Sequence, residues 1–251
     1  RLNYFLKDAF ELKSHLLEFL PINEDNFNNF LENAKMELAN IHPGDSSVES
    51  SEFYEDIVGD KHLADLAAWH LTSKEYIKST LKLQQDFSKN LVLDFGGGIG
   101  THALANAMSE NVEHVFFVDI NETNREFVKF RAKKLGLEQK ISFHKSIEDT
   151  NVKKFDSIVC LDVLEHLEDP AMQLDKFHEI MSEDSFSIFN WYFYKGDNNE
   201  YPFHLDEEKL VSKFFETLQY KFIETFHPLL ITTRVYKLSL IHISEPTRRI
   251  H

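Results

Sequence analysis

The chain has 251 residues, of which 42% are hydrophobic and 27% charged, values typical of a globular protein that buries its own core. Its net charge of −15 would repel a phosphate backbone and argues against a nucleic acid partner, and its apolar runs are too short for a membrane span. The single cysteine, Cys160, cannot form an internal disulfide, so we predict a reducing, cytoplasmic location.

The first part of the chain is predicted to be helical, because apolar residues recur every three or four positions. We expect helices over residues 2–20 and 23–41, separated at Pro21, and over about 52–87, with breaks near Gly59 and Thr72. The chain begins inside an apolar-periodic segment without an initiator methionine, so we expect residues upstream of it. We predict that residues 1–89 form a helical lid over the rest of the chain or a surface for homodimer formation.

From Asn90 onward, short apolar runs alternate with amphipathic segments, a pattern that predicts an α/β fold with a mostly parallel sheet. The expected strands lie within 91–95, 112–120, 140–146, 155–162, 185–193, 222–228 and 229–238, and the expected helices within 100–110, 121–136, 164–181 and 206–220. Only a turn at His227 and Pro228 joins the last two runs, which is too short for a parallel crossover. The sheet is therefore expected to end in an antiparallel hairpin.

Four of the eight glycines, Gly96, Gly97, Gly98 and Gly100, follow the first expected strand, LVLDF. In doubly wound sheets the turn after the first strand is where the backbone meets a ligand. The next expected strand ends at Asp119, and an acid at that spacing can accept hydrogen bonds from a ribose diol. The dinucleotide pattern G-x-G-x-x-G cannot be placed on these glycines, which disfavours a nicotinamide or flavin cofactor.

The observed pattern, Asp94-x-Gly96-x-Gly98-x-Gly100, resembles the first motif of the class I S-adenosylmethionine-dependent methyltransferases. The terminal hairpin and the segment FDSIVCLDVLEHLEDP, at 155–170, also resemble that family, the segment most closely its small-molecule branch. The resemblance covers about 90–237 and implies a Rossmann-like doubly wound domain over 90–238. It also implies the cofactor S-adenosyl-L-methionine (SAM).

The resemblance further implies a set of cofactor-binding residues: Asp94, Gly96, Gly98, Gly100, Asp119, Ile120, Ser146, Ile147, Leu161 and Asp162. In this assignment Asp94 and the glycine backbone hold the methionine part, and Asp119 binds the ribose hydroxyls. Ile120, Ser146 and Ile147 meet the adenine, while Leu161 and Asp162 lie near the methionine amino group and the acceptor. As alternatives, Asp119 only caps the helix that begins near Asn121, and Asp94 only orders the loop.

Candidate catalytic residues follow the fourth and fifth expected strands. His166 stands beside Glu165, and a histidine next to a carboxylate is a common acid and base pairing, although in this motif the pair more often orients the loop. Tyr201 and His204 lie in the aromatic segment 191–206 and are candidates, with Tyr192, for contact with the acceptor. The thirteen histidines are scattered without the spacing of a helical zinc site, so we predict no bound metal.

Together these features predict methyl transfer from SAM to a small organic acceptor at an O, N or C atom, by in-line displacement. Two alternatives are a nucleotide-dependent oxidoreductase and a non-catalytic module that binds SAM. The segment LSLIHISEPTR, at 238–248, resembles a translated sequencing adaptor, so we expect residues 239–251 to be a non-native tail.

Overall fold

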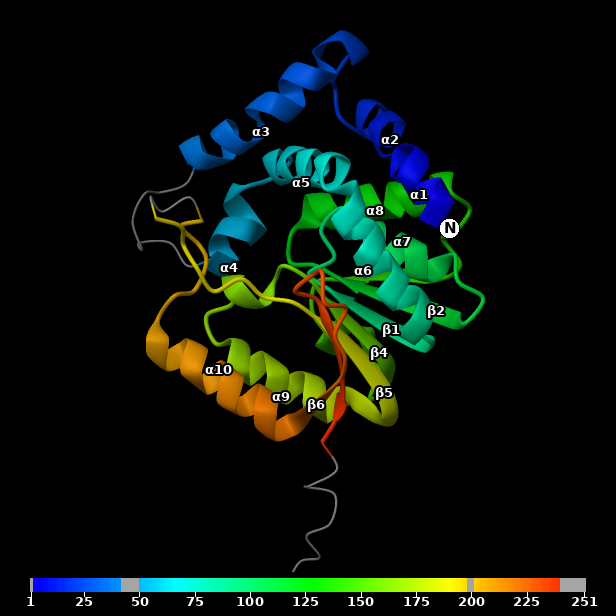
Figure 1. Cartoon of the computed structure of the whole chain (residues 1–251). Coiled ribbons are helices and arrows are strands. Elements are labelled where there is room, and N and C mark those ends of the chain that lie inside the picture. Colours follow the sequence, from blue (N-terminus) through cyan, green and yellow to red (C-terminus); the bar gives the residue numbers. More distant parts are fainter. Residues whose placement is uncertain (1, 42–49, 198–200, 240–251) are drawn as a thin grey trace, which may run out of the picture.

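A computed structural model describes residues 2–41, 50–197 and 201–239 (Figure 1). Its centre is a seven-stranded sheet with the order β3-β2-β1-β4-β5-β7-β6. The strands are β1 (Asn90–Phe95), β2 (Val112–Val118), β3 (Ile141–His144), β4 (Phe155–Cys160), β5 (Met181–Phe189), β6 (Phe222–Phe226) and β7 (Arg234–Leu238). Strands β1 to β5 pair in parallel, and β7 lies antiparallel between β5 and β6. The predicted α/β fold class is confirmed.

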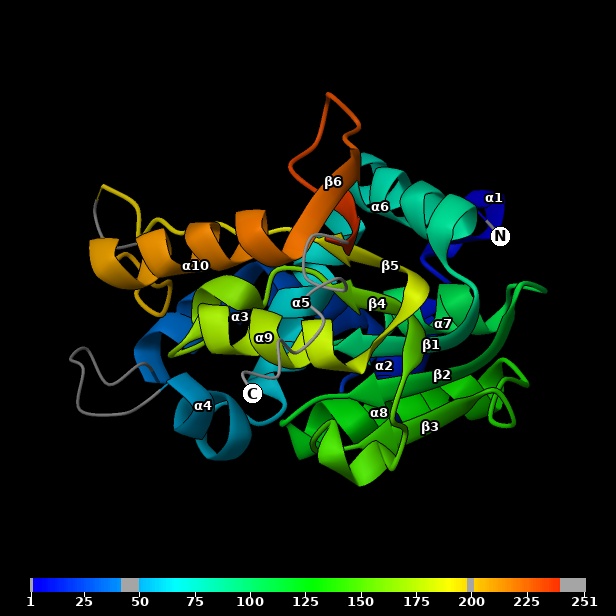
Figure 2. The same cartoon turned by 90° about the horizontal axis from the view of Figure 1, so that it is seen from below.

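Helices cover both faces of this sheet (Figures 1 and 2). The helices before it are α1 (Leu2–Asp8), α2 (Leu12–Phe19), α3 (Phe27–Ile41), α4 (Ser50–Glu52), the single π turn η2 (Phe53–Ile57), α5 (Lys61–Thr72) and α6 (Lys74–Phe87). Those within and after it are α7 (Thr101–Ala107), α8 (Glu122–Lys134), α9 (Pro170–Ile180) and α10 (Glu208–Lys221). Three short 3-10 turns occupy Glu24–Asn26, Glu148–Thr150 and Leu164–His166.

The two hydrophobic clusters show why the sheet needs helices on both faces. Side chains alternate along β1, so Val92 packs with the helices on one face and Leu93 with those on the other. The first cluster includes Phe5 and Leu63 of the N-terminal helices, which therefore share one core with the sheet. The second is formed with α9 and α10, as Phe214 illustrates.

The expected single helix over 2–20 is wrong, because the chain breaks between α1 and α2. Ala9, Phe10 and Glu11 have φ angles of +53°, +57° and +60°, outside the right-handed helical region. The carbonyl oxygens of Ala9 and Phe10 accept instead from the guanidinium of Arg131 in α8, at 2.9 and 3.1 Å. The expected breaks near Gly59 and Thr72 are confirmed by the bounds of α5.

Two further boundaries differ from the sequence expectation. The helix expected over 164–181 begins only at Pro170, where the Asp169 side chain accepts from the backbone N–H of Met172 at 2.9 Å. Strand β5 then starts directly at Met181, earlier than expected. The terminal hairpin is antiparallel as predicted, but its connection runs over residues 227–233 and is longer than a turn.

Within the described residues no helix is both long and apolar enough to cross a membrane. Apart from Ser239, the expected non-native tail lies outside the described residues.

Candidate functional site

The loop between β1 and α7 is shaped by glycines in left-handed conformations. Gly96, Gly98 and Gly100 have φ angles of +67°, +55° and +75°, which favour glycine over any other residue. A Cβ atom on Gly96 would lie 2.4 Å from Val163, and one on Gly98 would lie 2.9 Å from Leu66 of α5. The loop is therefore packed closely beneath both α5 and the segment that follows β4.

Asp119, at the end of β2, is bonded to this loop. It is 7% exposed, and its Oδ2 atom accepts from the backbone N–H of Gly98 at 2.9 Å. Its Oδ1 atom accepts from the N–H of Asn121 at 2.9 Å, and burial raises the pKa of the carboxyl to about 6. The cap of α8 is Asn121, whose side chain accepts from the N–H of Asn124. Asp119 is therefore not the N-cap residue of α8, although it bonds to the backbone N–H of that residue.

Asp94, at the end of β1, is more deeply buried than Asp119. It is 2% exposed, and its Oδ2 atom has no hydrogen-bond partner. Burial, and then repulsion from Asp119, raise the pKa of Asp94 to about 7, while a hydrogen bond from the Ala103 backbone opposes the shift. A buried carboxylate oxygen without a partner is costly, so this position favours a ligand that brings a donor or a positive charge.

The predicted adenine-binding residues Ile120, Ser146 and Ile147 lie close to these acids along the same edge of the sheet. Arg125 of α8 donates to the carbonyl oxygens of Asp119 and Ile120, at 2.6 and 2.8 Å, and fixes the turn after β2. The N–H of Asp119 donates to the carbonyl of His144, the last residue of β3, so Ser146 follows at the same sheet edge. Ser146 forms a local turn with Asp149 by donating its backbone N–H to that carboxylate, at 3.0 Å. The Ile147 side chain packs against the second hydrophobic cluster.

Asp162, after β4, has a φ angle of +55° and forms a reciprocal pair with Asn190, after β5. Its N–H donates to Asn190 Oδ1 at 2.6 Å, and Asn190 Nδ2 donates back to Asp162 Oδ1 at 2.7 Å. Asn190 Nδ2 also donates to the hydroxyl of Tyr76 in α6, at 2.8 Å. Leu161, which precedes Asp162, packs against the first hydrophobic cluster. Asn190 and Tyr76 were not among the predicted site residues.

The predicted catalytic residues His166, Tyr201 and His204 form a cluster of rings at the carboxyl edge of the sheet, after β4 and β5. The ring centroids of His166 and His204 are 4.6 Å apart, and Tyr201 stacks on His204 with centroids 4.9 Å apart. Tyr54, in η2, approaches from the N-terminal part, with its hydroxyl 3.4 Å from His166 Nδ1. A backbone hydrogen bond from Leu205 to the carbonyl of Glu165, at 2.6 Å, joins the two segments that carry the histidines.

Burial controls the protonation of this cluster. Burial, and then His204 and His62, lower the pKa of His166 to about 3, so its imidazole is uncharged at neutral pH. Burial also lowers the pKa of His204. Glu165 is 1% exposed, its Oε2 atom has no partner, and burial, with a contribution from Asp162, raises the pKa of its carboxyl to about 8.

A family model described as a methyltransferase domain matches residues 68–204, which is more than half of the chain. The chain belongs to this methyltransferase family. A search of curated protein sequences found no match.

The methyltransferase is similar to several solved structures. One is the magnesium protoporphyrin IX methyltransferase from Synechocystis PCC 6803 with bound SAM, with 15% identity and a TM-score of 0.51, covering 78% of this chain and 100% of that one. Another is a SAM-dependent methyltransferase from Clostridium acetobutylicum ATCC 824, with 14% identity and a TM-score of 0.46. The match covers 65% of this chain and 89% of that one. A third is a methyltransferase from Geobacter sulfurreducens, with 17% identity and a TM-score of 0.47. The match covers 69% of this chain and 88% of that one.

SAM is the cofactor of the methyltransferase, and the buried groups at the glycine loop fit it. SAM carries a positive sulfonium and a positive ammonium group, and it has no phosphate. The loop region offers the unpartnered Oδ2 atom of Asp94 and a second buried carboxylate on Asp119, and no lysine lies between Asp94 and Gly100. This charge pattern suits a cationic ligand better than a phosphate.

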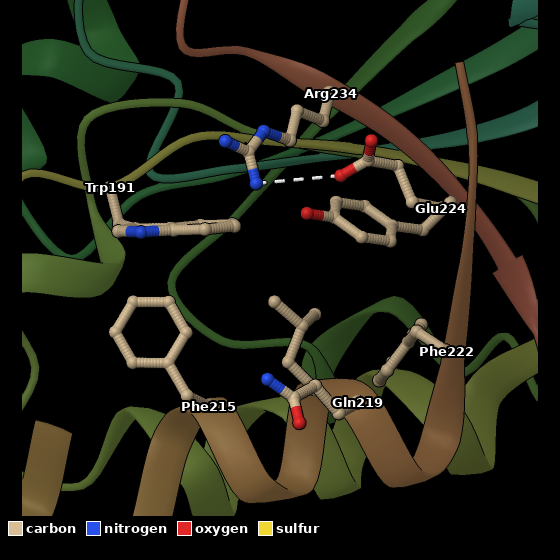
Figure 3. Close-up of a pocket in the computed structure, with 8 residues that line it drawn as sticks. Trp191, Phe215, Gln219, Phe222, Glu224 and Arg234 are labelled. Atoms are coloured by element: carbon tan, nitrogen blue, oxygen red, sulfur yellow. Dashed lines mark ion pairs between the residues drawn. The ribbon is translucent and has the colours of Figure 1, made fainter. Parts of the chain in front are cut away.

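A pocket of about 330 Å³ in the methyltransferase lies elsewhere, between α10 and the terminal hairpin (Figure 3). Trp191, Phe215 and Tyr236 line it, with an ion pair of 3.4 Å between Arg234 and Glu224 at its wall. None of the predicted cofactor or catalytic residues lines this pocket. Trp191 packs there against Phe214 of α10, with ring centroids 5.1 Å apart, as expected for a largely structural side chain.

Proposed function

We propose that the methyltransferase transfers the methyl group of SAM to a small organic acceptor that binds beside the cluster of Tyr54, His166, Tyr201 and His204. The observation that carries this proposal is the convergence of these four side chains from separate segments. Two of the segments follow β4 and β5, where ligands bind in doubly wound sheets, and the third covers them from the N-terminal part.

We assign the cofactor to the carboxyl ends of β1 and β2. Asp94 and the backbone of Gly96, Gly98 and Gly100 would hold the methionine part, while Asp119 would bind the ribose hydroxyls. Ile120, Ser146 and Ile147 would meet the adenine. Leu161 and Asp162 would lie near the methionine amino group and the acceptor. Support comes from the position of Asp119, which is held next to Gly98 by a hydrogen bond of 2.9 Å.

The N-terminal helices form the cover of this site in our proposal. Leu66 of α5 packs over Gly98, and the Tyr54 carbonyl accepts from Asn121 Nδ2 at 2.9 Å. The same stretch of chain therefore contacts both the cofactor loop and the predicted acceptor cluster. This arrangement favours a lid role for the helical part, because a cover over both sites would exclude water from the reaction.

When bound, SAM supplies an electrophilic methyl group with a good neutral leaving group. The protein then has to align the acceptor and keep the site dry, which can account for much of the rate enhancement. The Tyr201 hydroxyl and the ring nitrogens of His166 and His204 provide hydrogen-bonding groups that can orient a polar acceptor. The aromatic faces around them suit a planar or apolar acceptor body.

Calorimetric titration with SAM, S-adenosylhomocysteine and NADH in parallel is the first test. We expect SAM and S-adenosylhomocysteine to bind and NADH not to bind. Incubation with isotope-labelled SAM and a panel of small hydroxyl, amino and carbon acids, read by mass spectrometry, then tests transfer. SAM binding with no transfer to any acceptor would favour the non-catalytic module, and NADH binding alone would favour the oxidoreductase.

A further inference from the structure

Glu165, His166 and His204 bring three potential metal-binding atoms together. One ligand atom from each side chain lies within 4.8 Å of the other two, and within the described residues no other group of three His, Cys, Asp or Glu side chains meets this condition. The histidines are far apart in the sequence, which is why their spacing did not predict a metal site. The hydrogen bond from Leu205 to the Glu165 carbonyl holds the two segments together.

The buried carboxylate provides a second, independent observation. Glu165 is 1% exposed, and its Oε2 atom has no hydrogen-bond partner. An unpartnered carboxylate oxygen in the interior is costly, and a bound cation would satisfy it. Two imidazoles with one carboxylate form a donor set that binds zinc and other divalent transition metals.

The two histidine rings are close to the separation that a shared ion requires. Their ring centroids are 4.6 Å apart with an interplanar angle of 82°. Two imidazoles that bind one ion at about 2.1 Å with a tetrahedral angle have their centroids roughly 5.3 Å apart, so the rings have to separate by a fraction of an ångström when the ion binds. His204 Nδ1 lies 3.1 Å from the Tyr194 carbonyl oxygen, to which it can only donate, and the Tyr192 backbone also bonds to this imidazole. In the uncharged ring with its proton on Nδ1, the lone pair is on Nε2, as in metal sites where a carbonyl fixes the tautomer of a ligating histidine.

We propose that Glu165, His166 and His204 form a binding site for a divalent transition-metal ion of the zinc type. The three side chains supply two nitrogen ligands and one oxygen ligand, so at least one coordination position is left for water or another oxygen ligand. The place of this ion within the acceptor region rests on the proposed function, and with the ion bound the two histidines would act on the acceptor through the ion instead of by direct hydrogen bonds. The metal site itself does not rest on the proposed function, because it depends only on the three side chains.

Metal titration of the full chain tests this site. Protein that has been treated with a chelator and desalted is titrated with Zn²⁺ by calorimetry and with Co²⁺ by visible absorption. We expect one ion per chain and the ligand-field bands of Co²⁺ bound to nitrogen and oxygen. Glu165→Gln, His166→Ala and His204→Ala should each weaken binding by more than about 10-fold, and Glu165→Gln keeps nearly the same side-chain shape.

His227→Ala is the matched control, because His227 also lies near a carboxylate, with Nδ1 3.8 Å from Glu224, but belongs to no such group. Its metal affinity should equal that of the unmodified protein. SAM affinity and circular dichroism of each variant check that it is folded. Failure of the unmodified protein to bind either ion would overturn the site, and so would metal affinity that survives in all three folded variants. Because metal binding is measured without SAM, a failure of methyl transfer would overturn the proposed function and leave the metal site standing.

Discussion

The backbone N–H of Gly98 donates to the Asp119 carboxylate at 2.9 Å, which ties the glycine loop after β1 to the end of β2. The same carboxylate accepts from the N–H of Asn121 at the start of α8. One acidic side chain thus orders two turns that meet at the carboxyl edge of the sheet. Its loss should disturb the shape of the loop as well as any contact with the cofactor.

Asp119→Ala should weaken SAM binding by about 1.5–3 kcal/mol, the range for hydrogen bonds to a charged group. This corresponds to an increase of about 10- to 150-fold in the dissociation constant. Calorimetric titration measures the change, and Asp184→Ala, at an exposed position of β5, is the control with no expected effect. An unchanged dissociation constant in folded Asp119→Ala would remove the ribose assignment.

The contribution of Asp94 to the stability of the ligand-free protein should fall as the pH rises from about 4 to about 7. Burial raises the pKa of Asp94 from 3.8 in a free side chain to about 7 in the folded protein. Within this window the unfolded chain has an ionised Asp94, whereas the folded protein keeps the carboxyl protonated. Deprotonation of Asp94 therefore favours the unfolded chain. Buried histidines such as His15 and His166, whose pKa values are lowered to about 4 and about 3, act in the opposite direction over part of this window, so a melt of the unmodified protein does not isolate Asp94.

Asp94→Asn removes this titrating group with little change of size, so the melting temperature of the variant should gain on that of the unmodified protein as the pH rises from about 4 to about 7. Both proteins share the other buried groups that titrate here, such as Asp119 and Glu165, so the difference between the two melting temperatures reports mainly on Asp94. Bound SAM should reduce the Asp94 contribution in the unmodified protein, since a cationic ligand favours the carboxylate. A difference that stays constant across the window would show that Asp94 does not titrate in it.

Gly96→Ala should destabilise the protein more than Gly136→Ala, although both glycines have a φ angle of +67°. The left-handed conformation costs a non-glycine residue about 1–2 kcal/mol at either position. Nothing lies within 4 Å of a Cβ atom on Gly136, whereas one on Gly96 would lie 2.4 Å from Val163. Overpacking should add about 1–3 kcal/mol at Gly96.

Chemical denaturation of the two variants gives the difference in the free energy of unfolding. Val163→Ala combined with Gly96→Ala should recover part of the added loss, because it removes the methyl groups that the new Cβ atom meets. Equal losses for the two single variants would mean that the loop relaxes freely and is not held by Val163.

The fold could be read largely from the sequence, because strand and helix periodicity alternate clearly from Asn90 onward. The terminal hairpin was predicted correctly, although the connection over 227–233 is longer than the expected turn, because it is still too short for a parallel crossover. The break at Ala9 to Glu11 could not be found this way, because it depends on Arg131, a residue from a distant helix that is neutral in any local pattern. Apolar periodicity continues through the break, so the pattern alone favours one helix.

The cofactor residues could be proposed from the sequence because they lie in short motifs at the ends of strands, and their contacts with SAM stay predictions. Tyr54 and Tyr76 could not be proposed in this way, since each lies in a helical stretch without a motif and reaches the site only through tertiary packing. Asn190 had one usable signal, a polar residue at the end of an apolar run. The approach of His204 to His166 carried no signal, because it depends on how the segment after β5 folds back.

Arg131→Met should uncouple the N-terminal helices from the glycine loop. Arg131 is fully buried, and its guanidinium donates to the Ile99 carbonyl at 2.7 Å as well as to those of Ala9 and Phe10. Methionine fills a similar volume but leaves these three carbonyl groups without their donor. We expect the free energy of unfolding to fall by about 2–4 kcal/mol, since the cost of unpaired buried acceptors exceeds the gain from removing a buried charge.

Lys134→Met, on the same helix, is the control for Arg131→Met. Its ammonium pairs with Glu18 at the surface, and its side chain is 41% exposed, so the loss should be below about 1 kcal/mol. Hydrogen exchange distinguishes coupling from a uniform loss of stability. In Arg131→Met, amides of residues 2–12 and of the loop at 96–100 should exchange faster together, because one side chain bonds to both segments, whereas amides in β4 should change least. Faster exchange in residues 2–12 alone would mean that the glycine loop keeps its shape without Arg131, and SAM affinity should then be unchanged.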